Sequence, residues 1–326
     1  MITIDGSRLE GGGQLVRAAV ALAALSGEGV AIENIRARRK NPGLRSQHIA
    51  AVRAVAGACG AECTGLSVGS GRLRFVPGPL RERSLQVDVG TAGSIPLVLQ
   101  AWLPAATVAG GTIRVSGGTE VAWSPTIDYA EHVFLRALRD AGAAVELRIL
   151  RRGYFPRGGG LVEVVAAPSD LSPVRPSPEG AGGIISCSSN LPAHVAERQA
   201  KAAATRLLSS AGELPVTLDR REELETGSSC TVWQAQKGGC AIGRRGYPAE
   251  RVGEDAADAL LAELASPASV DLHLADQLIL YLARYGGSFT APSLSLHAAT
   301  MCWLCGEFGL TVSHRTTQAG LVEVRA

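Results

Sequence analysis

One order of secondary structure occurs twice in the first half of the chain, and it constrains the fold more than any other feature. Hydrophobic periodicity predicts strand, helix, strand, helix, strand, strand over residues 2–78, and the same order over residues 85–165. In both copies the second helix begins about 33 or 34 positions after the first. A repeat of this kind predicts structural units of one shape, βαβαββ.

The predicted elements are bounded by the ends of the apolar patterns. In the first copy they are strands at 2–4 and 30–35, helices at 11–25 and 44–58, and closing strands at 61–68 and 73–76. In the second they are strands at 85–89 and 112–116, helices at 92–103 and 126–141, and closing strands at 144–150 and 161–165. The helix at 92–103 is expected to stop before Pro104, since proline disfavours the helical conformation in the residue before it.

A third, interrupted copy is predicted at the end of the chain. It has helices at 273–282 and 296–306, a strand at 288–291 and closing strands at 310–313 and 321–324. Its opening strand is expected near 171–174, where Pro173 weakens it. Between this strand and the first helix lie strands at 184–186, 216–218, 231–234 and 241–243, and helices at 193–208 and 249–264.

The predicted fold class is therefore α/β (α+β). Three βαβαββ repeat units form a large domain from residues 1–179 and 269–326, and residues 180–268 form a smaller inserted α/β domain. Prolines and glycines between 173 and 183 are typical of a linker leading into the insertion.

Composition narrows the class of protein. With 46% hydrophobic and 19% charged residues the chain is globular, and a net charge of +2 implies no basic tail and no broad nucleic-acid surface. The start has no signal-peptide pattern and no apolar run reaches the length of a membrane span, so we expect a cytoplasmic protein with no membrane contact. The oligomeric state is left open.

The seven cysteines are an odd number in a chain without a secretory signal, so we expect free thiols. Cys302 and Cys305 form one CxxC pair inside an apolar helix. Without a second pair, this spacing favours core packing over zinc or redox chemistry.

The stretch at 271–300 has the clearest chemical signal. It contains His273 and His297, and Gly286-Gly287 makes a turn before the last helix, so that His297 is expected near the start of that helix. A helix start carries free N–H groups and partial positive charge, which keep an imidazole neutral and can face a phosphate. That suits a nucleophilic histidine, although a histidine packed in a core helix is the alternative.

Two loops could serve phosphate chemistry. In the segment EGGGQLVR at 10–17, glycines would let a phosphate approach the backbone and Glu10 could hold a divalent metal ion, although a plain strand-to-helix turn is the alternative. The segment is not a P-loop, because the Lys-Ser/Thr ending is absent. The loop at 36–45 has five cationic side chains and precedes a helix. This pattern fits a phosphate-binding loop and a solvated charged loop equally well.

For two further motifs a structural role is the leading interpretation. The segment GTAGS at 90–94 suits a helix start, with Gln100 two turns on, and YFPRGGG at 154–160 reads as a tight turn in which Arg157 could contact phosphate.

Taken together, these motifs resemble the RNA 3′-terminal phosphate cyclase family over nearly the whole chain. The matching segments are EGGGQLVR at 10–17, PGLRSQH at 42–48, GTAGS at 90–94, YFPRGGG at 154–160, HVAER at 194–198, RRGYPAERVGE at 244–254, HLADQ at 273–277 and the helix containing His297. The family's large domain of three βαβαββ units with a small inserted domain agrees with the repeats. The resemblance implies ATP-dependent conversion of an RNA 3′-phosphate into a 2′,3′-cyclic phosphate. The route passes through a covalent histidine-AMP intermediate and an adenylylated RNA end.

The resemblance also implies roles for particular residues. His297 would be the nucleophile and Glu10 would carry Mg²⁺ or Mn²⁺. ATP and RNA 3′-phosphate ends would be the partners. The residues implied for substrate phosphates are Arg17, Arg36, Arg39, Gln47 and His48, and those implied for the nucleotide are Gln100, Pro125, His273, Leu274, Ala275, Asp276 and Gln277.

Two other functions remain as alternatives. A catalytically inactive cyclase-like protein of RNA processing would share the fold and lack the nucleophile, so His297 speaks against it. An enolpyruvyl transferase would use similar units, but normally six of them in a longer chain.

Overall fold

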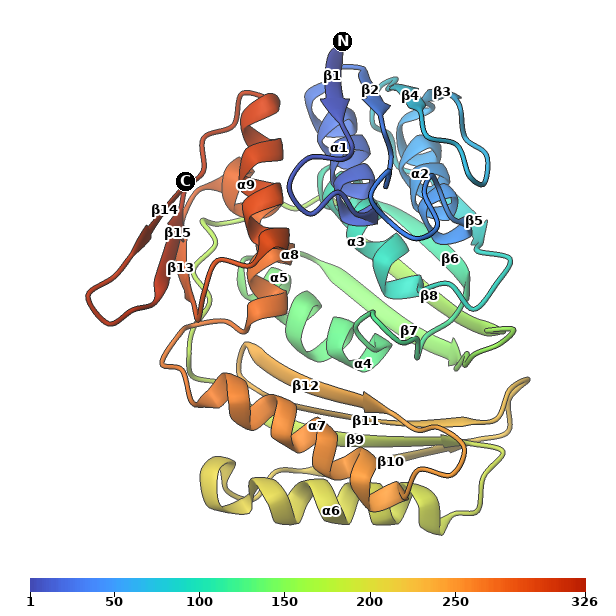
Figure 1. The fold of residues 1–326 in the computed structure, drawn as a ribbon, viewed down its shortest axis with the longest axis vertical. Helices are drawn as coiled ribbons and strands as arrows, with labels where there is room; N and C mark the ends of the chain where they lie inside the picture. Colours follow the sequence, from blue (N-terminus) through green and yellow to red (C-terminus); the bar gives the residue numbers. More distant parts are fainter.

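The computed structural model describes residues 1–326 and contains the predicted repeat (Figure 1). In the first unit, β1 (Ile2–Asp5), β2 (Val30–Glu33), β3 (Glu62–Thr64) and β4 (Leu73–Val76) form a sheet of order β1-β2-β4-β3. In the second, β5 (Ser84–Asp88), β6 (Gly111–Gly117), β7 (Val145–Arg151) and β8 (Gly160–Ala166) form a sheet of order β5-β6-β8-β7. In both sheets the first pair of strands is parallel and the other pairs are antiparallel, which confirms two copies of one unit.

The helices of the first unit end in the same way. Helices α1 (Gly13–Ser26) and α2 (Ser46–Cys59) are each followed by a glycine in the left-handed conformation, Gly27 with φ 74° and Gly60 with φ 65°. Only glycine adopts this conformation without steric cost, so these two residues fix where the chain turns back to the sheet.

In the second unit, two helix predictions need correction. Helix α3 (Ile95–Ala109) continues through Pro104, so the predicted stop before this proline is wrong. Its residues Trp102, Leu103, Ala105 and Ala106 are all buried, and burial on every side outweighs the loss of one backbone hydrogen bond. The second helix of the unit is divided into α4 (Ile127–Tyr129), a π-helical turn η1 (Ala130–Phe134) and α5 (Leu135–Asp140).

The third unit contains the helices α8 (Leu272–Tyr285) and α9 (Leu296–Glu307) and a sheet of order β13-β15-β14. Its strands are β13 (Ser288–Ala291), β14 (Ser313–Thr316), which lies later than predicted, and β15 (Val322–Arg325).

The predicted opening strand of this unit, at 171–174, is wrong. Only a single parallel bridge joins Val174 to Gly287, through bonds from Val174 N to Gly286 O (2.8 Å) and from Ser288 N to Val174 O (3.0 Å). Pro176, two positions on, has no N–H to continue the ladder, and Ser172 N donates to Ala141 O instead. The bridge nevertheless occupies the place of β1 and β5 in the other sheets.

Residues of the predicted insertion form their own sheet with two helices on one face (Figure 1). The sheet has the order β10-β9-β11-β12 and consists of β9 (Gly182–Ser189), β10 (Val216–Arg221), β11 (Gly227–Gln234) and β12 (Lys237–Ile242). The helices are α6 (His194–Ala211) and α7 (Ala249–Leu264). A hydrophobic cluster of ten buried residues lies here, separate from the cluster of 68 in the rest of the chain. We propose that the two clusters mark two domains; the boundaries at 179/180 and 268/269 stay a prediction.

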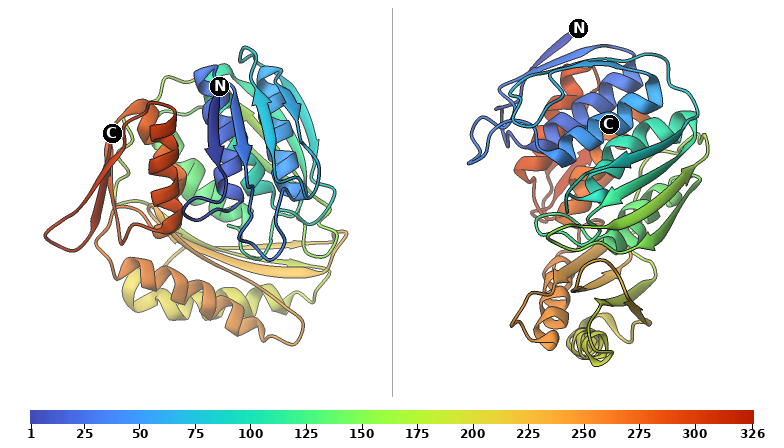
Figure 2. Two further views of the ribbon diagram at one scale, coloured as in Figure 1. Left: turned by 45° about the horizontal axis from the view of Figure 1, so that its top comes forward. Right: turned by 90° about the vertical axis from the view of Figure 1, so that its right-hand side faces the viewer.

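The helices of the three units pack against one another, and their sheets lie outside them (Figures 1 and 2). Helix α1 buries ten consecutive residues, Leu15 to Ala24, which requires neighbours on all sides. This central position brings the N-terminus of α1 close to those of α2 and α9.

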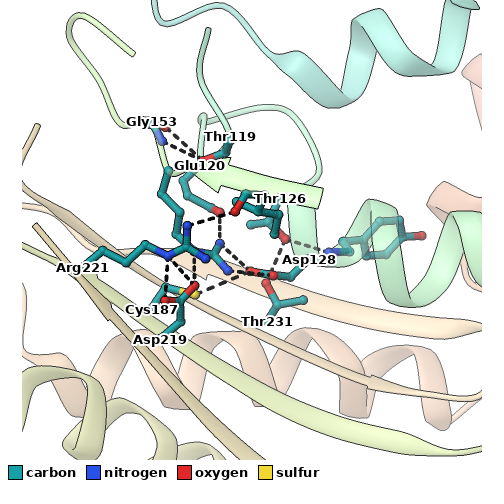
Figure 3. A network of polar contacts seen from close by, with 12 residues as sticks. Thr119, Glu120, Thr126, Asp128, Gly153, Cys187, Asp219, Arg221 and Thr231 are labelled. Carbon is teal, nitrogen blue, oxygen red and sulfur yellow. Dashed lines mark hydrogen bonds and ion pairs between the residues drawn. The ribbon is translucent and has the colours of Figure 1, made fainter. Parts of the chain in front are cut away.

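A buried network of charges joins the inserted sheet to the second unit (Figure 3). The guanidinium of Arg152 is 2% exposed and donates to Glu120 Oε1 (2.6 Å), Asp128 Oδ2 (2.7 Å) and Asp219 Oδ2 (2.8 Å). Asp219 lies on β10, whereas Glu120 and Asp128 belong to the large part of the chain. Burial raises the pKa of Glu120 to about 8, although Arg152 opposes the shift. The two parts are therefore fixed to each other by one shared cation.

The contact between α6 and α7 gives a stability prediction. A Cβ on Gly253 of α7 would lie 2.0 Å from Gln199 O of α6, whereas a Cβ on Gly306 of α9 would meet nothing within 4 Å. We expect Gly253→Ala to lower the free energy of unfolding by about 1–3 kcal/mol, because two backbones must separate. Gly306→Ala should leave it unchanged or raise it by up to about 1 kcal/mol.

Urea unfolding, followed by hydrogen exchange at the amides of α6 and α7, measures both variants. Equal stability of Gly253→Ala and Gly306→Ala would contradict the close helix contact.

Candidate functional site

His297 is the second residue of α9 and lies at the helix N-terminus, as predicted. The side chain of Ser295 caps this helix by accepting from Ala298 N at 2.9 Å. The His297 side chain is 49% exposed, and its Nδ1 lies 2.5 Å from Gln14 Oε1. An amide oxygen only accepts hydrogen bonds, so Nδ1 carries the proton and the lone pair is on Nε2. Burial, aided by the charges of Arg17, Arg39 and His273, lowers the pKa of His297 below 6.5 and keeps the ring neutral.

Glu10 lies beside this histidine. Its Oε2 is 3.9 Å from His297 Nδ1, and it has no hydrogen-bond partner although it is buried. Its Oε1 forms an ion pair with Arg39, which also donates to Glu10 O at 3.3 Å. Glu10 N donates to Thr300 Oγ1 at 3.3 Å. The glycine loop (10–13), the arginine loop (36–45) and the start of α9 therefore come together around Glu10.

Two glycines make this meeting possible. A Cβ on Gly12 would lie 2.0 Å from Glu10 Oε2, and a Cβ on Gly13 would lie 2.0 Å from His48 Nε2. A larger residue at position 13 would push away the buried His48 ring at the start of α2, and one at position 12 would displace the Glu10 carboxylate, so these two glycines keep the arrangement of the site.

Arg17 lines a small pocket between the helices. Its side chain is 8% exposed, burial lowers its pKa to about 10, and it forms no hydrogen bond or ion pair within the chain. The pocket has a volume of about 40 Å³ and is lined by the predicted residues Arg17, Gln100, Asp276 and Gln277, together with Gln14, Ala18, Pro104, Leu280, Tyr281 and Met301. The first helices of all three units, α1, α3 and α8, contribute to it.

The pocket lining has unused polar groups. Gln277 Oε1 and Tyr281 OH are buried without a partner. Burial raises the pKa of Asp276 to about 8, against the opposing charge of Arg17. A volume of about 40 Å³ is far below the roughly 300–1,000 Å³ of small-molecule sites, so side chains must move before a nucleotide can occupy this pocket.

Three other predicted phosphate residues have partners within the chain. Arg36 donates to Asn41 O (2.7 Å) and Gly43 O (2.9 Å), which holds the arginine loop closed on itself. His48 is 3% exposed, and its Nδ1 accepts from Arg45 N at 3.0 Å. Gln47 Oε1 accepts from Ser94 N at 3.3 Å and so connects the starts of α2 and α3.

The structure does not bring the remaining predicted nucleotide residues to the pocket. Leu274 and Ala275 are buried in the hydrophobic core, and His273 is exposed on α8. Pro125 lies in the loop between β6 and α4. For these four the predicted contact with nucleotide stays a prediction.

Sequence reasoning missed residues that the site uses. Gln14 was part of the glycine motif but had no assigned role, and its position one turn before Arg17 on α1 was the available signal. Tyr281 and Met301 had no such signal, because only the packing of α8 against α9 places them at the pocket.

No group of three or more histidine, cysteine, aspartate or glutamate side chains could hold a metal ion. Glu10 alone offers a carboxylate beside His297. One carboxylate supplemented by substrate phosphates is an ordinary arrangement for Mg²⁺, so the donor set fits a cation that arrives with a nucleotide. All seven cysteines are free, and Cys305 is fully buried in the core. No helix is long and apolar enough to cross a membrane.

A partly exposed neutral histidine, a carboxylate and unpartnered arginine at converging helix starts are typical of an enzyme that acts on phosphate groups. The family model described as RNA 3′-terminal phosphate cyclase matches residues 8–313. The chain is 44% identical to the RNA 3′-terminal phosphate cyclase of Methanosarcina mazei, with 99% of each chain covered. It is 46% identical to those of Methanococcoides burtonii (94% of each covered) and Thermococcus onnurineus (94% of this chain and 93% of the relative).

The chain therefore belongs to the RNA 3′-terminal phosphate cyclase family. This family membership excludes the enolpyruvyl transferase alternative.

The buried His48 gives a pH prediction. Burial, with the charges of Arg17, Arg36 and Arg45, lowers its pKa from 6.5 to about 3. The unfolded chain binds a proton here below pH 6.5 and the folded chain does not, so folding stability falls as pH drops from about 6.5 toward 3. Between pH 7.5 and 5 the loss from this group is about 2 kcal/mol.

We expect His48→Asn, which keeps an acceptor for Arg45 N, to lose less stability than wild type over this interval. Urea unfolding at several pH values measures the difference in slope. His314→Asn, at an exposed histidine on β14, is the control and should follow wild type. A wild-type slope in His48→Asn would contradict a neutral buried His48.

Proposed function

We propose that this chain is an ATP-dependent RNA 3′-terminal phosphate cyclase in which His297 is the nucleophile. The observation that supports this most is the hydrogen bond between His297 Nδ1 and Gln14 Oε1. It leaves the Nε2 lone pair free on a half-exposed ring at a helix N-terminus. The proposal also rests on the activity in the names of relatives that match nearly the whole chain.

In the first step, His297 Nε2 attacks the α-phosphorus of ATP. An N–P bond forms, the bond to the bridging oxygen breaks, and pyrophosphate leaves with the electron pair. The ring becomes positively charged. Nδ1 keeps its proton and continues to donate it in the hydrogen bond to Gln14 Oε1. The carboxylate of Glu10, 3.9 Å from Nδ1, stabilises that charge.

In the second step, an oxygen of the RNA 3′-phosphate attacks the AMP phosphorus and the N–P bond breaks, which returns His297 to its neutral form. In the third, the ribose 2′-hydroxyl gives its proton to solvent as its oxygen attacks the 3′-phosphorus. AMP leaves and the 2′,3′-cyclic phosphate closes. Adenylylation is needed because a phosphate monoester has no good leaving group.

Arginines supply the positive charge for these steps. Arg17 has no partner within the chain and is therefore free to pair with a phosphate. Arg39 pairs with Glu10 and would exchange that carboxylate for phosphate. A divalent cation at Glu10 would reduce the charge on the phosphates. Gln100, Asp276 and Gln277 would contact the nucleotide after the pocket opens.

The alternative of an inactive cyclase-like protein has less support, because the nucleophile is present and partly exposed. A pulse of ATP labelled at the α-phosphorus should transfer label to the wild-type protein. His297→Ala should take none, since the acceptor atom is missing. His314→Ala, at an exposed histidine on β14, is the matched control and should be labelled like wild type.

Labelled protein should then release label as AMP when RNA with a 3′-phosphate is added, and should retain it when the RNA ends in a 3′-hydroxyl. Absence of label on the wild type would sink the covalent mechanism. Label on His297→Ala would show that another residue is the nucleophile.

Gln14 gives a separate prediction about the reactive ring. In Gln14→Glu, a carboxylate would face Nδ1 and raise the pKa of His297, which now lies below 6.5. The adenylylation rate of wild type should fall only below that pKa, because the protonated ring has no lone pair. In Gln14→Glu the fall should begin at higher pH.

Rates of AMP transfer from pH 5 to 8.5 test this. Gln318→Glu, in the exposed turn between β14 and β15, is the control. A profile of Gln14→Glu that coincides with wild type would show that Gln14 does not govern the ring.

A further inference from the structure

Trp123 is the feature that the proposed mechanism does not use. Its side chain is fully exposed, at 102% of the reference area, whereas Trp102 is 1% exposed and Trp233 stacks on His132 at 4.1 Å between ring centroids. Its backbone has φ 66°, a conformation rare for bulky residues. An indole in this position buries no apolar surface when the chain folds, so it contributes little to stability and is available to bind a ligand.

The loop that carries Trp123 is fixed on both sides. Gly118 forms a parallel bridge with Ser94, and the Ser124 and Ser94 hydroxyls are hydrogen-bonded to each other. On the far side, Thr126 Oγ1 caps α4 through Tyr129 N (3.1 Å) and contacts Thr231 Oγ1 (2.8 Å). The loop that carries the exposed ring is therefore fixed next to Ser94, at the end of the segment at 90–94.

A groove lies beside this segment. It has a volume of about 390 Å³ and is lined by Arg45, Ser46, Gln47, Val68, Thr91 and Gly93. No carboxylate lines it, and the Arg45 guanidinium forms no ion pair or hydrogen bond within the chain. This volume is within the range of roughly 300–1,000 Å³ that small-molecule sites have, and the free cation suits a phosphate.

The groove is connected to His297 through the helix starts. Gln47 lies next to His48, whose Nε2 is packed against Gly13, and the neighbouring Gln14 holds His297. Gln47 also binds Ser94 N, the residue that contacts the loop of Trp123. A strand with its 3′-phosphate at His297 could thus continue past the N-termini of α1 and α2 to the groove and the indole.

We propose that this groove and Trp123 form a subsite for single-stranded RNA upstream of the 3′-phosphate. Arg45 pairs with a backbone phosphate, and the indole of Trp123 stacks on one base. Exposed aromatic rings beside cationic grooves bind single strands in this way, with little dependence on base identity. The inference rests on the proposed function, because RNA is taken as the substrate.

The test measures RNA binding without ATP, so it does not depend on catalysis. Dissociation constants are measured for a fluorescent 3′-phosphorylated single-stranded RNA with wild type, Trp123→Ala and Trp123→Phe. We expect Trp123→Ala to bind roughly 5- to 150-fold more weakly, the range for loss of one stacked base, and Trp123→Phe to retain most of the affinity. Leu208→Ala, at an exposed apolar residue on α6, is the control and should bind like wild type.

The stacked base is identified by RNAs that each have one abasic nucleotide among the last few positions. At one position the abasic RNA should bind wild type as weakly as intact RNA binds Trp123→Ala, and the two losses should not add. For Arg45→Ala, the slope of log affinity against log salt should decrease by about 0.7, the value for one phosphate of a single strand.

Several outcomes would overturn the inference. They are wild-type affinity of Trp123→Ala for intact RNA, additive losses at every abasic position, and a salt slope that Arg45→Ala leaves unchanged. If Trp123→Ala instead slows transfer of AMP to the protein while RNA binding is normal, the indole serves the nucleotide. Failure of the wild type to take AMP would count against the proposed mechanism alone, since RNA binding is measured separately.

Discussion

The close approach of the first turns of α1, α2 and α9 is the constraint on which the rest of the site depends. Gly13 permits the contact between α1 and α2, because a Cβ there would lie 2.0 Å from His48 Nε2, and Gly12 leaves room for the Glu10 carboxylate. With these turns in contact, Gln14 bonds to His297 and the Glu10 carboxylate lies near Nδ1 of the imidazole. Three helix N-termini then lie close together, and their partial positive charges favour the phosphates of the proposed reaction.

A second constraint fixes the inserted part of the chain. Arg152 is shared by Glu120, Asp128 and Asp219, of which the last belongs to the inserted sheet. Removing one member of a buried ionic group costs about 3–5 kcal/mol, since the others remain desolvated and unpaired. The network therefore discourages movement between the two parts near β7 and β10. The loop of Trp123 lies between Glu120 and Asp128, so two members of this network flank the loop that we propose to bind RNA.

Local patterns predicted most elements, and the exceptions have tertiary causes. The helix at 249–264 has the predicted bounds, and the order of elements in the first two units is as predicted. Helix α3 passes through Pro104 because burial on all sides compensates for one missing backbone bond. The opening strand at 171–174 was reduced to a bridge because a strand requires successive donors, and Pro176 supplies none. A local sequence pattern carries no information about what packs around a helix or which strand pairs with another.

For the site, the sequence by itself determined the repeat, the glycine-rich and arginine-rich loops and a histidine at a helix start, since each depends on residues close together in the chain. Only the tertiary structure decided that Gln14 orients the ring, that Arg17 lacks a partner and that Tyr281 and Met301 complete the pocket. It also separated Asp276 and Gln277, which face the pocket, from Leu274 and Ala275, which face the core. The reason is that the pocket lies where helices of three units meet, and contacts between units leave no local trace in the chain.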